Sequence, residues 1–443
     1  MMSHSEPARL LSGATLRKAL SSYHNVLAVV AGLTLLQAAS AALLVVVALT
    51  LKSSGASSFA IGAVASAYSL GFILGAVLSP REIARIGHIR AYALFAAMAA
   101  ILALIFTLKA EAAVWAVIQA GVGACAAALF TAGESWIANA APPARRGSVL
   151  GFYHLVSKAG SIAGPFAVAG AEPGMAGFMI VSALFAASLV PVTATSRTQP
   201  EFSSAEPFGL RRLWRRAPAA VMAAFIAGMV NNSVAQLYPV YVSTLDLNGA
   251  GETSALFNAA LLAGALATLM PAGWLSDRLD RRIIIAVLGG IGAAASIGLV
   301  VCGHTGFAPG IWSFAILFGA GSYSFYGVAV AHGADRARPD ETTSVMAGIL
   351  MIWGTGAVVG PLVAGLVMSL GAGGAGLFMF AGTGLTVLAL SSAWRALAKD
   401  PVPADDKEPF TTAPATSFAI AEFDPRGADG QLDLFADNEK AAP

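Results

Sequence analysis

The chain has 443 residues, of which 57% are hydrophobic and only 11% are charged. Soluble globular domains carry about 25% charged residues, so this composition excludes a water-soluble fold and favours a protein whose solvent is lipid. The formal net charge of +2 says little about partners, because the positions of the charges along the chain matter more than their sum.

Twelve apolar stretches are long enough to cross a membrane, since a hydrocarbon core of about 30 Å needs about 20 helical residues. In the first half they are 24–48, 59–79, 91–108, 112–133, 148–170 and 174–194. In the second half they are 219–240, 253–275, 283–302, 310–331, 343–368 and 373–393. The first stretch is too long for the apolar region of a signal peptide. The sequence therefore predicts an all-α membrane protein with twelve transmembrane helices in two six-helix bundles.

The segments around these stretches define the expected domain organisation. We expect a cytoplasmic N-terminal segment over 1–23, an N-terminal bundle over 24–194, a central cytoplasmic loop over 195–218, a C-terminal bundle over 219–393 and a disordered cytoplasmic tail over 394–443. The tail is acidic and contains Pro, Ala and Thr, which is typical of disorder. Its segment 431–435 (QLDLF) is similar to the motif by which bacterial proteins dock on the DNA polymerase sliding clamp. We interpret that likeness as chance or as some other tail contact.

Basic residues fall almost entirely on one side of the predicted bundle. Only Lys52 and Lys109 belong to the other side. The basic residues of the first side are Arg9, Arg17, Lys18, Arg81, Arg85, Arg90, Arg145, Arg146, Arg197, Arg211, Arg212, Arg215, Arg216, Arg278, Arg281, Arg282, Arg336, Arg338, Arg395 and Lys399. By the positive-inside rule this side is cytoplasmic, so both termini are expected there. The short basic segment 211–216 predicts contact with membrane lipids rather than nucleic acid.

The two halves repeat at an offset of 196–197 residues. Arg81 and Arg85 follow the second stretch as Arg278 and Arg282 follow the eighth. A parallel repeat of two six-helix units is a transporter architecture.

A second repeated feature is a glycine and proline cluster in the fifth and eleventh stretches. Glycines spaced by four let helices approach closely, and proline removes a helical hydrogen bond and permits bending. The predicted hinge residues are Gly160, Gly164, Pro165, Gly356, Gly360 and Pro361. Helix packing alone is the alternative interpretation of both clusters.

Over residues 17–397 the chain resembles the major facilitator superfamily. The segment 273–282 (GWLSDRLDRR) is similar to the loop signature of that family, whereas Pro80 stands where the first-half copy usually has Asp. The resemblance implies a charge network that closes the cytoplasmic side. Its candidate members are Asp277, Arg278, Arg282, Arg81, Arg85 and Glu134. Glu134 is expected to replace the missing partner of Arg81 or Arg85, or to be a solvated carboxylate at the membrane interface.

The cluster of Gly160, Gly164 and Pro165 resembles the fifth-helix motif associated with antiporters of that superfamily. This likeness favours efflux over uptake and a bacterial drug-exporter-like or metabolite-exporter-like branch. It also implies a location in the bacterial cytoplasmic (inner) membrane.

Lys158 is the one basic residue deep in a predicted span, about 17 Å from its start, and His154 lies one turn earlier. None of the 24 acidic residues lies near a bilayer centre. Lys158 could bind an anionic substrate group, be neutral, or pair with polar side chains and carbonyls. Polar or aromatic residues of other spans complete the candidate substrate site: Gln37, Asn231, Asn232, Gln236, Tyr323 and Trp353, with Tyr68 and Tyr153 as weaker additions. Adjacent Asn231 and Asn232 cannot share one helix face.

Motifs of ATP-driven or enzymatic chemistry are absent from the sequence. It contains no Gly-Lys pair for a phosphate-binding loop, no His-Glu-x-x-His and no Gly-x-Ser-x-Gly. We therefore expect neither an enzyme nor a cofactor or metal. The predicted function is a secondary active transporter, monomeric and proton-coupled, that exports a small anionic or neutral organic solute through a neutral or positive cavity. The alternative is a non-transporting receptor or scaffold of the same fold that acts through its tail.

Overall fold

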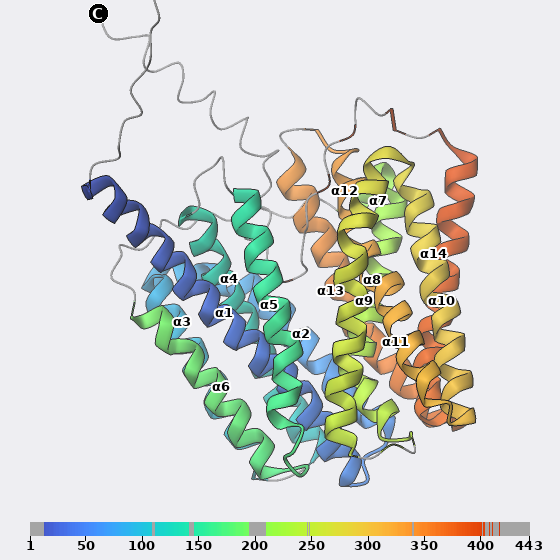
Figure 1. The fold of residues 1–443 in the computed structure, drawn as a ribbon, viewed down its shortest axis with the longest axis horizontal. Coiled ribbons are helices and arrows are strands. Elements are labelled where there is room, and N and C mark those ends of the chain that lie inside the picture. Colours follow the sequence, from blue (N-terminus) through green and yellow to red (C-terminus); the bar gives the residue numbers. More distant parts are fainter. Residues whose placement is uncertain are drawn as a thin grey trace, which may run out of the picture.

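The computed structural model describes residues 13–108, 111–140, 146–194, 210–245, 247, 249–338 and 341–400, and residues 402, 403, 407, 410 and 416 of the tail. The regular structure of these residues is helical, as expected. Figure 1 shows the helices of the first half on the left and those of the second half on the right. The segment 431–435 lies outside the described residues.

The helices of the first half are α1 (Gly13–Ser53), α2 (Ser58–Ile86), α3 (His88–Ile105), α4 (Ala112–Ala140), α5 (Arg146–Val168) and α6 (Met175–Thr193). The central loop contains α7 (Leu210–Arg216). The second half contains α8 (Pro218–Val242), α9 (Ala250–Arg278), α10 (Arg281–Thr305), α11 (Ala308–Ser322), α12 (Phe325–Ala334), α13 (Thr342–Val367) and α14 (Gly376–Ala398). Several helices are longer than the apolar stretches that predict them. A charged residue ends an apolar stretch, but the backbone hydrogen bonds of the helix can continue past it.

Ten stretches of the described residues are long and apolar enough to cross a membrane. One of them, Ser344–Ala398, contains both α13 and α14. Between these helices the backbone leaves helical geometry at Leu370 and at Gly371, whose φ of 105° suits glycine. The helix α5 is not among the ten, so the number of twelve spans stays a prediction.

The expected span 310–331 is interrupted between α11 and α12. The side-chain amide of Asn231 in α8 donates to the backbone carbonyl of Ser322 at 2.9 Å, and the Ser322 hydroxyl donates back to Asn231. A helix that continued through this point would need the Ser322 carbonyl for its own backbone bond. The insertion of a side chain into the hydrogen-bond ladder accounts for the break.

The repeated glycines lie at close helix contacts in both halves. A Cβ atom on Gly160 or Gly164 of α5 would stand 2.4 or 2.1 Å from a backbone oxygen of α1. A Cβ atom on Gly356 or Gly360 of α13 would stand 2.2 Å from a backbone oxygen of α8. The two halves therefore use the same device to bring one pair of helices into backbone contact.

Substitution of Gly164 by alanine is expected to lower the free energy of unfolding by about 1–3 kcal/mol, because α5 must move away from α1 to admit the methyl group. Gly151, on the same helix, is the matched control, since a Cβ atom there meets nothing within 4 Å. Gly151→Ala should leave stability unchanged or raise it slightly. Thermal unfolding in detergent measures both variants, and equal midpoints would contradict the packing role of Gly164.

The two halves meet at one end of the bundle. We call the end that carries Arg81, Arg278 and Arg395 the arginine-rich end. At the opposite end, a Cβ atom on Gly62 of α2 would lie 2.3 Å from the carbonyl oxygen of Pro361 in α13.

Two further contacts close the same end. The Phe59 backbone N–H donates to the hydroxyl of Ser369 at 2.9 Å. A Cβ atom on Gly251 of α9 would stand 2.4 Å from the carbonyl oxygen of Ala169, just after α5. Backbones this close leave no passage between α2 and α13 or between α5 and α9, so at the end opposite the arginines the two halves are in contact along both of these seams.

Candidate functional site

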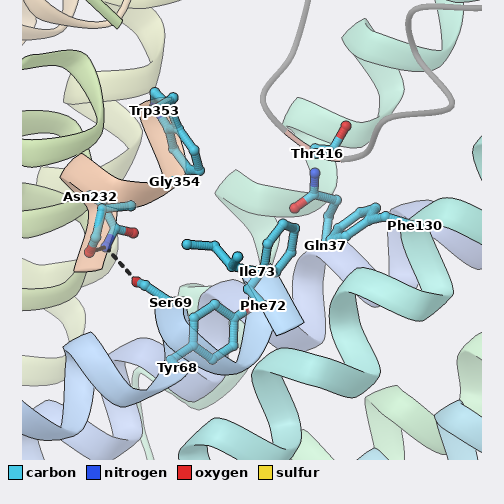
Figure 2. A pocket seen from close by; sticks show the side chains of 11 residues that line it. Gln37, Tyr68, Ser69, Phe72, Ile73, Phe130, Asn232, Trp353, Gly354 and Thr416 are labelled. Atoms are coloured by element: carbon cyan, nitrogen blue, oxygen red, sulfur yellow. Dashed lines mark hydrogen bonds between the residues drawn. The ribbon is translucent and has the colours of Figure 1, made fainter. Parts of the chain in front are cut away.

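A cavity of about 160 Å³ lies between the two halves. Figure 2 shows the side chains that surround it. The lining residues are Gln37 of α1, Tyr68, Ser69, Phe72 and Ile73 of α2, Phe130 of α4, Asn232 of α8, Trp353, Gly354 and Ala357 of α13, and Thr416 of the tail. Five helices from both halves contribute, which is the arrangement expected of a site that responds to movement of one half against the other.

The lining combines aromatic rings with amide and hydroxyl groups. The Phe72 ring centroid lies 6.3 Å from the centroids of both Tyr68 and Phe130. Trp353 faces them from the second half (Figure 2). Among the described lining residues none carries an ionised side chain at neutral pH. The cavity can therefore stack a flat solute and exchange hydrogen bonds with it, but it offers no counter-charge.

Asn232 connects the two halves at this site. Its side-chain amide donates to the Ser69 hydroxyl of α2 at 2.8 Å and to the Ala357 carbonyl of α13 at 2.8 Å. Asn231 points to a different neighbour, Ser322. The two adjacent asparagines thus face in different directions, as their positions on one helix require.

Other candidate residues lie outside the lining. Gln236 donates to the carbonyl of Ala65 at 3.3 Å, and the Tyr323 hydroxyl donates to the carbonyl of Asn231 at 3.4 Å. Lys158 is half-buried in α5 and makes no hydrogen bond or ion pair within the described part of the chain. The Nε2 atom of His154 is buried and likewise has no hydrogen-bond partner among the described residues.

A buried carboxylate lies one helical turn from the cavity. Phe130 lines the cavity, and Glu134 follows it by four residues on the same face of α4. Glu134 is 0% exposed, and its Oε1 atom accepts a hydrogen bond of 2.6 Å from the Tyr153 hydroxyl of α5. The Thr416 hydroxyl donates to the same oxygen, also at 2.6 Å. Its sequence position at the end of an apolar stretch concealed this burial, because α4 continues to Ala140.

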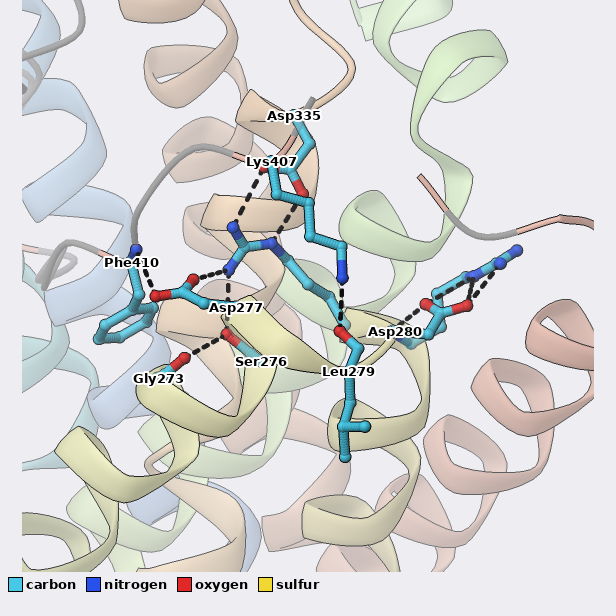
Figure 3. A network of polar contacts seen from close by, with 10 residues as sticks. Gly273, Ser276, Asp277, Leu279, Asp280, Asp335, Lys407 and Phe410 are labelled. Carbon is cyan, nitrogen blue, oxygen red and sulfur yellow. Dashed lines mark hydrogen bonds and ion pairs between the residues drawn. The ribbon is translucent and has the colours of Figure 1, made fainter. Parts of the chain in front are cut away.

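A second polar cluster lies at the arginine-rich end of the second half (Figure 3). Arg281 donates to both carboxylate oxygens of Asp335, at 2.7 and 3.2 Å, and to Asp277 at 3.1 Å. The Arg281 and Asp335 side chains are each 1% exposed. Neither was among the candidate network residues, although Arg281 belongs to the loop signature. Asp335 lies 54 residues from Arg281, so only the fold brings the two together.

The remaining candidates of this network make other contacts. Arg278 lies over the Trp274 ring, 3.7 Å from its centroid. Arg282 pairs with Asp280 at 2.6 Å and also donates to backbone carbonyls at the end of α14. In the first half, Arg85 pairs with Glu82 at 3.7 Å on the surface, and Arg81 is exposed.

Two carboxylates outside the membrane-spanning helices are held in the ionised form. Burial raises the pKa of Asp280, but the hydrogen bonds and charge of Arg282 outweigh it, so the pKa lies below the usual value. Partial desolvation likewise raises the pKa of Glu341, and its contacts with Arg216, Arg338 and Arg212 bring the net pKa down. Arg212 and Arg216 belong to α7, so this cluster attaches the central loop to the start of α13.

Comparisons with known proteins agree with this architecture. The model of the Major Facilitator Superfamily matches residues 29–352. The MFS-type transporter YcaD of Escherichia fergusonii is 24% identical over 346 residues, which cover 77% of this chain and 88% of the relative. YcaD of Escherichia coli O7:K1 is 26% identical over 357 residues, which cover 79% and 90%.

Solved structures share the fold. A bacterial homologue of the human lysosomal transporter Spinster, in an inward-facing and occupied conformation, superposes with a TM-score of 0.70 at 17% identity and covers 88% of this chain and 98% of its own. The nucleoside transporter NupG gives a TM-score of 0.67 at 14% identity, covering 84% and 98%. A D-xylose–proton symporter gives 0.64 at 14%, covering 88% and 99%.

Proposed function

The chain belongs to the Major Facilitator Superfamily, a family of membrane transporters, and we propose that it carries a small, uncharged, aromatic solute through the cavity between its halves. The observation that carries this proposal is the lining of the cavity. Aromatic rings from both halves and the amides of Gln37 and Asn232 surround the space, and none of its described lining residues is ionised. The sequence predicts either an anionic or a neutral solute. The neutral lining supports a neutral solute, because Lys158, the residue expected to bind an anionic group, is not part of the lining.

Alternating access would proceed from the conformation described. The opposite end is closed by backbone contacts such as that of Gly62 with Pro361, so the solute would enter from the arginine-rich end. Opening the opposite end would break two hydrogen bonds between the halves, one between Phe59 and Ser369 and the other between Asn232 and Ser69. The glycine and proline clusters of α5 and α13 are the proposed hinges of this movement.

Export driven by protons is the direction and coupling that we propose. The positive-inside rule assigns the arginine-rich end to the cytoplasm of a bacterial inner membrane, with both termini on that side. The solute would then bind from the cytoplasm. Glu134, buried one turn from the cavity beside Tyr153, is the proposed proton carrier, because a carboxyl group so placed can change its charge as the cavity changes its access.

A ligand screen on the purified protein tests the substrate class. Uncharged aromatic heterocycles are expected to raise the thermal unfolding midpoint, whereas aliphatic carboxylates and lipophilic cations are not. Trp353→Ala should weaken binding of the compounds found by about tenfold, since the solute loses a stacking surface. Trp394→Ala is the matched control, because that ring is 66% exposed on α14. Stabilisation by carboxylates or by lipophilic cations alone would refute the proposed class.

A further inference from the structure

Three described residues of the C-terminal tail contact the helix bundle at the arginine-rich end. The ammonium group of Lys407 donates to the Leu279 carbonyl at 2.8 Å, just beyond α9. The Phe410 backbone N–H donates to the Asp277 carboxylate at 3.1 Å (Figure 3). Asp277 also accepts from the buried Arg281, so the tail is bound to the same carboxylate that belongs to the loop signature.

The Phe410 ring occupies a space that two glycines leave open. A Cβ atom on Gly273 of α9 would lie 2.2 Å from the ring, and one on Gly327 of α12 would lie 3.1 Å from it. Phe410 packs against the apolar core in this position. A side chain at Gly273 would exclude the ring, so this part of the loop signature has the shape of a socket for Phe410.

Thr416 reaches the other half of the protein. Its hydroxyl donates to the buried Glu134 of α4, and its side chain forms part of the cavity lining (Figure 2). Phe410 thus contacts the second half, and Thr416, six positions later, contacts the first half.

We propose that Lys407, Phe410 and Thr416 of the tail form an internal plug, which closes the cavity from the arginine-rich end. While it is bound, Thr416 takes a position in the cavity lining and engages the carboxylate of Glu134. A solute entering from that end must therefore displace the plug. We also expect displacement of the plug to speed transport. This expectation rests on the proposed function, but the binding of the plug itself does not.

Cysteine labelling tests the plug without any transported compound. Cys125 and Cys302 are both buried and would first be replaced by serine. Gln37→Cys then places one thiol in the cavity, and its reaction rate with a bulky hydrophilic maleimide is measured on the purified chain. Ending the chain after Asp400, or Phe410→Ala in the full chain, should raise the rate by about tenfold, because each removes contacts that keep the plug bound.

Matched variants separate the plug from other effects. Pro403→Ala, at an exposed tail position, and a chain ended after Thr416 should both react at the full-length rate. A second reporter, Ser54→Cys, lies exposed at the opposite end and should react equally in every variant if the fold is intact.

Each outcome of the labelling decides the question. Equal rates at Gln37→Cys in the full chain and in the chain ended after Asp400 would overturn the plug. A fast rate in the chain ended after Thr416 would overturn its assignment to these three residues. If labelling depends on the tail but the protein transports nothing, the plug stands and the transport proposal is refuted. If the protein transports its solute but labelling does not depend on the tail, the transport proposal stands and the plug is refuted.

Discussion

Replacing Arg281 with alanine is expected to lower the free energy of unfolding by about 3–5 kcal/mol. Arg281 donates two hydrogen bonds to Asp335 and a third to Asp277, and both Arg281 and Asp335 are 1% exposed. The alanine variant leaves the Asp335 carboxylate buried without this partner, and such a charge cannot be rehydrated without local opening. Denaturant or thermal unfolding in detergent measures the loss.

Two comparisons make this result specific. Arg85→Ala removes an arginine from a surface pair in which the side chains of Arg85 and Glu82 are 75% and 47% exposed, and it should cost about 0–1 kcal/mol. The double variant Arg281→Ala/Asp335→Ala removes the buried carboxylate as well and should be more stable than Arg281→Ala alone. Similar losses for Arg281→Ala and Arg85→Ala would refute the buried pair as a source of stability.

Glu134→Gln is expected to abolish transport against a gradient while solute exchange continues. Glutamine has the size of glutamate and can still accept a hydrogen bond from Tyr153, but it cannot carry a proton. With one proton per solute, a pH difference of about one unit supports about a tenfold concentration ratio in the native protein. The variant should approach a ratio of about one under the same gradient.

The assay uses proteoliposomes and an aromatic compound identified by thermal stabilisation. Glu82→Gln is the control, because that carboxylate lies on the surface of the same half and is 47% exposed. It should behave as the native protein does. If Glu134→Gln kept a pH-driven concentration ratio, the proton would have to be carried elsewhere, and Glu134 would lose its proposed role.

The two halves differ in how they place charge at the arginine-rich end. In the second half, Arg281 binds Asp335 and Asp277 within a buried cluster. In the first half, Pro80 occupies the position that corresponds to Asp277, and the described ion pair of that region is the surface pair of Arg85 and Glu82. Among the described residues of the first half, Glu134 is a buried carboxylate that accepts hydrogen bonds from Tyr153 and Thr416. Loss of one partner should therefore cost more stability at the buried pair of the second half than at the surface pair of the first half.

Much of the architecture could be predicted from the sequence. The low charge content and the long apolar stretches determine a helical membrane protein, because a helix satisfies its own backbone hydrogen bonds in lipid. The repeated glycines also predict their contacts, since Gly160 and Gly164 against α1 match Gly356 and Gly360 against α13. These properties depend on the composition and spacing within single segments, and both can be counted along the chain.

The candidate site depended on information that the sequence does not contain. Asn232 faces the cavity while Asn231 binds Ser322, and this choice follows from how α8 is rotated against its neighbours. Glu134 lies just beyond the apolar stretch that predicts α4, and it is buried where Tyr153 of α5 contacts it. Thr416 reaches Glu134 across 282 residues of sequence.

Hydropathy therefore determined which segments enter the membrane, and the tertiary structure decided which side chains meet there. The physical reason is that burial in lipid adds up residue by residue along one helix. A cavity, by contrast, depends on the rotation and separation of helices that are remote in sequence, and neither quantity is a local property of the chain.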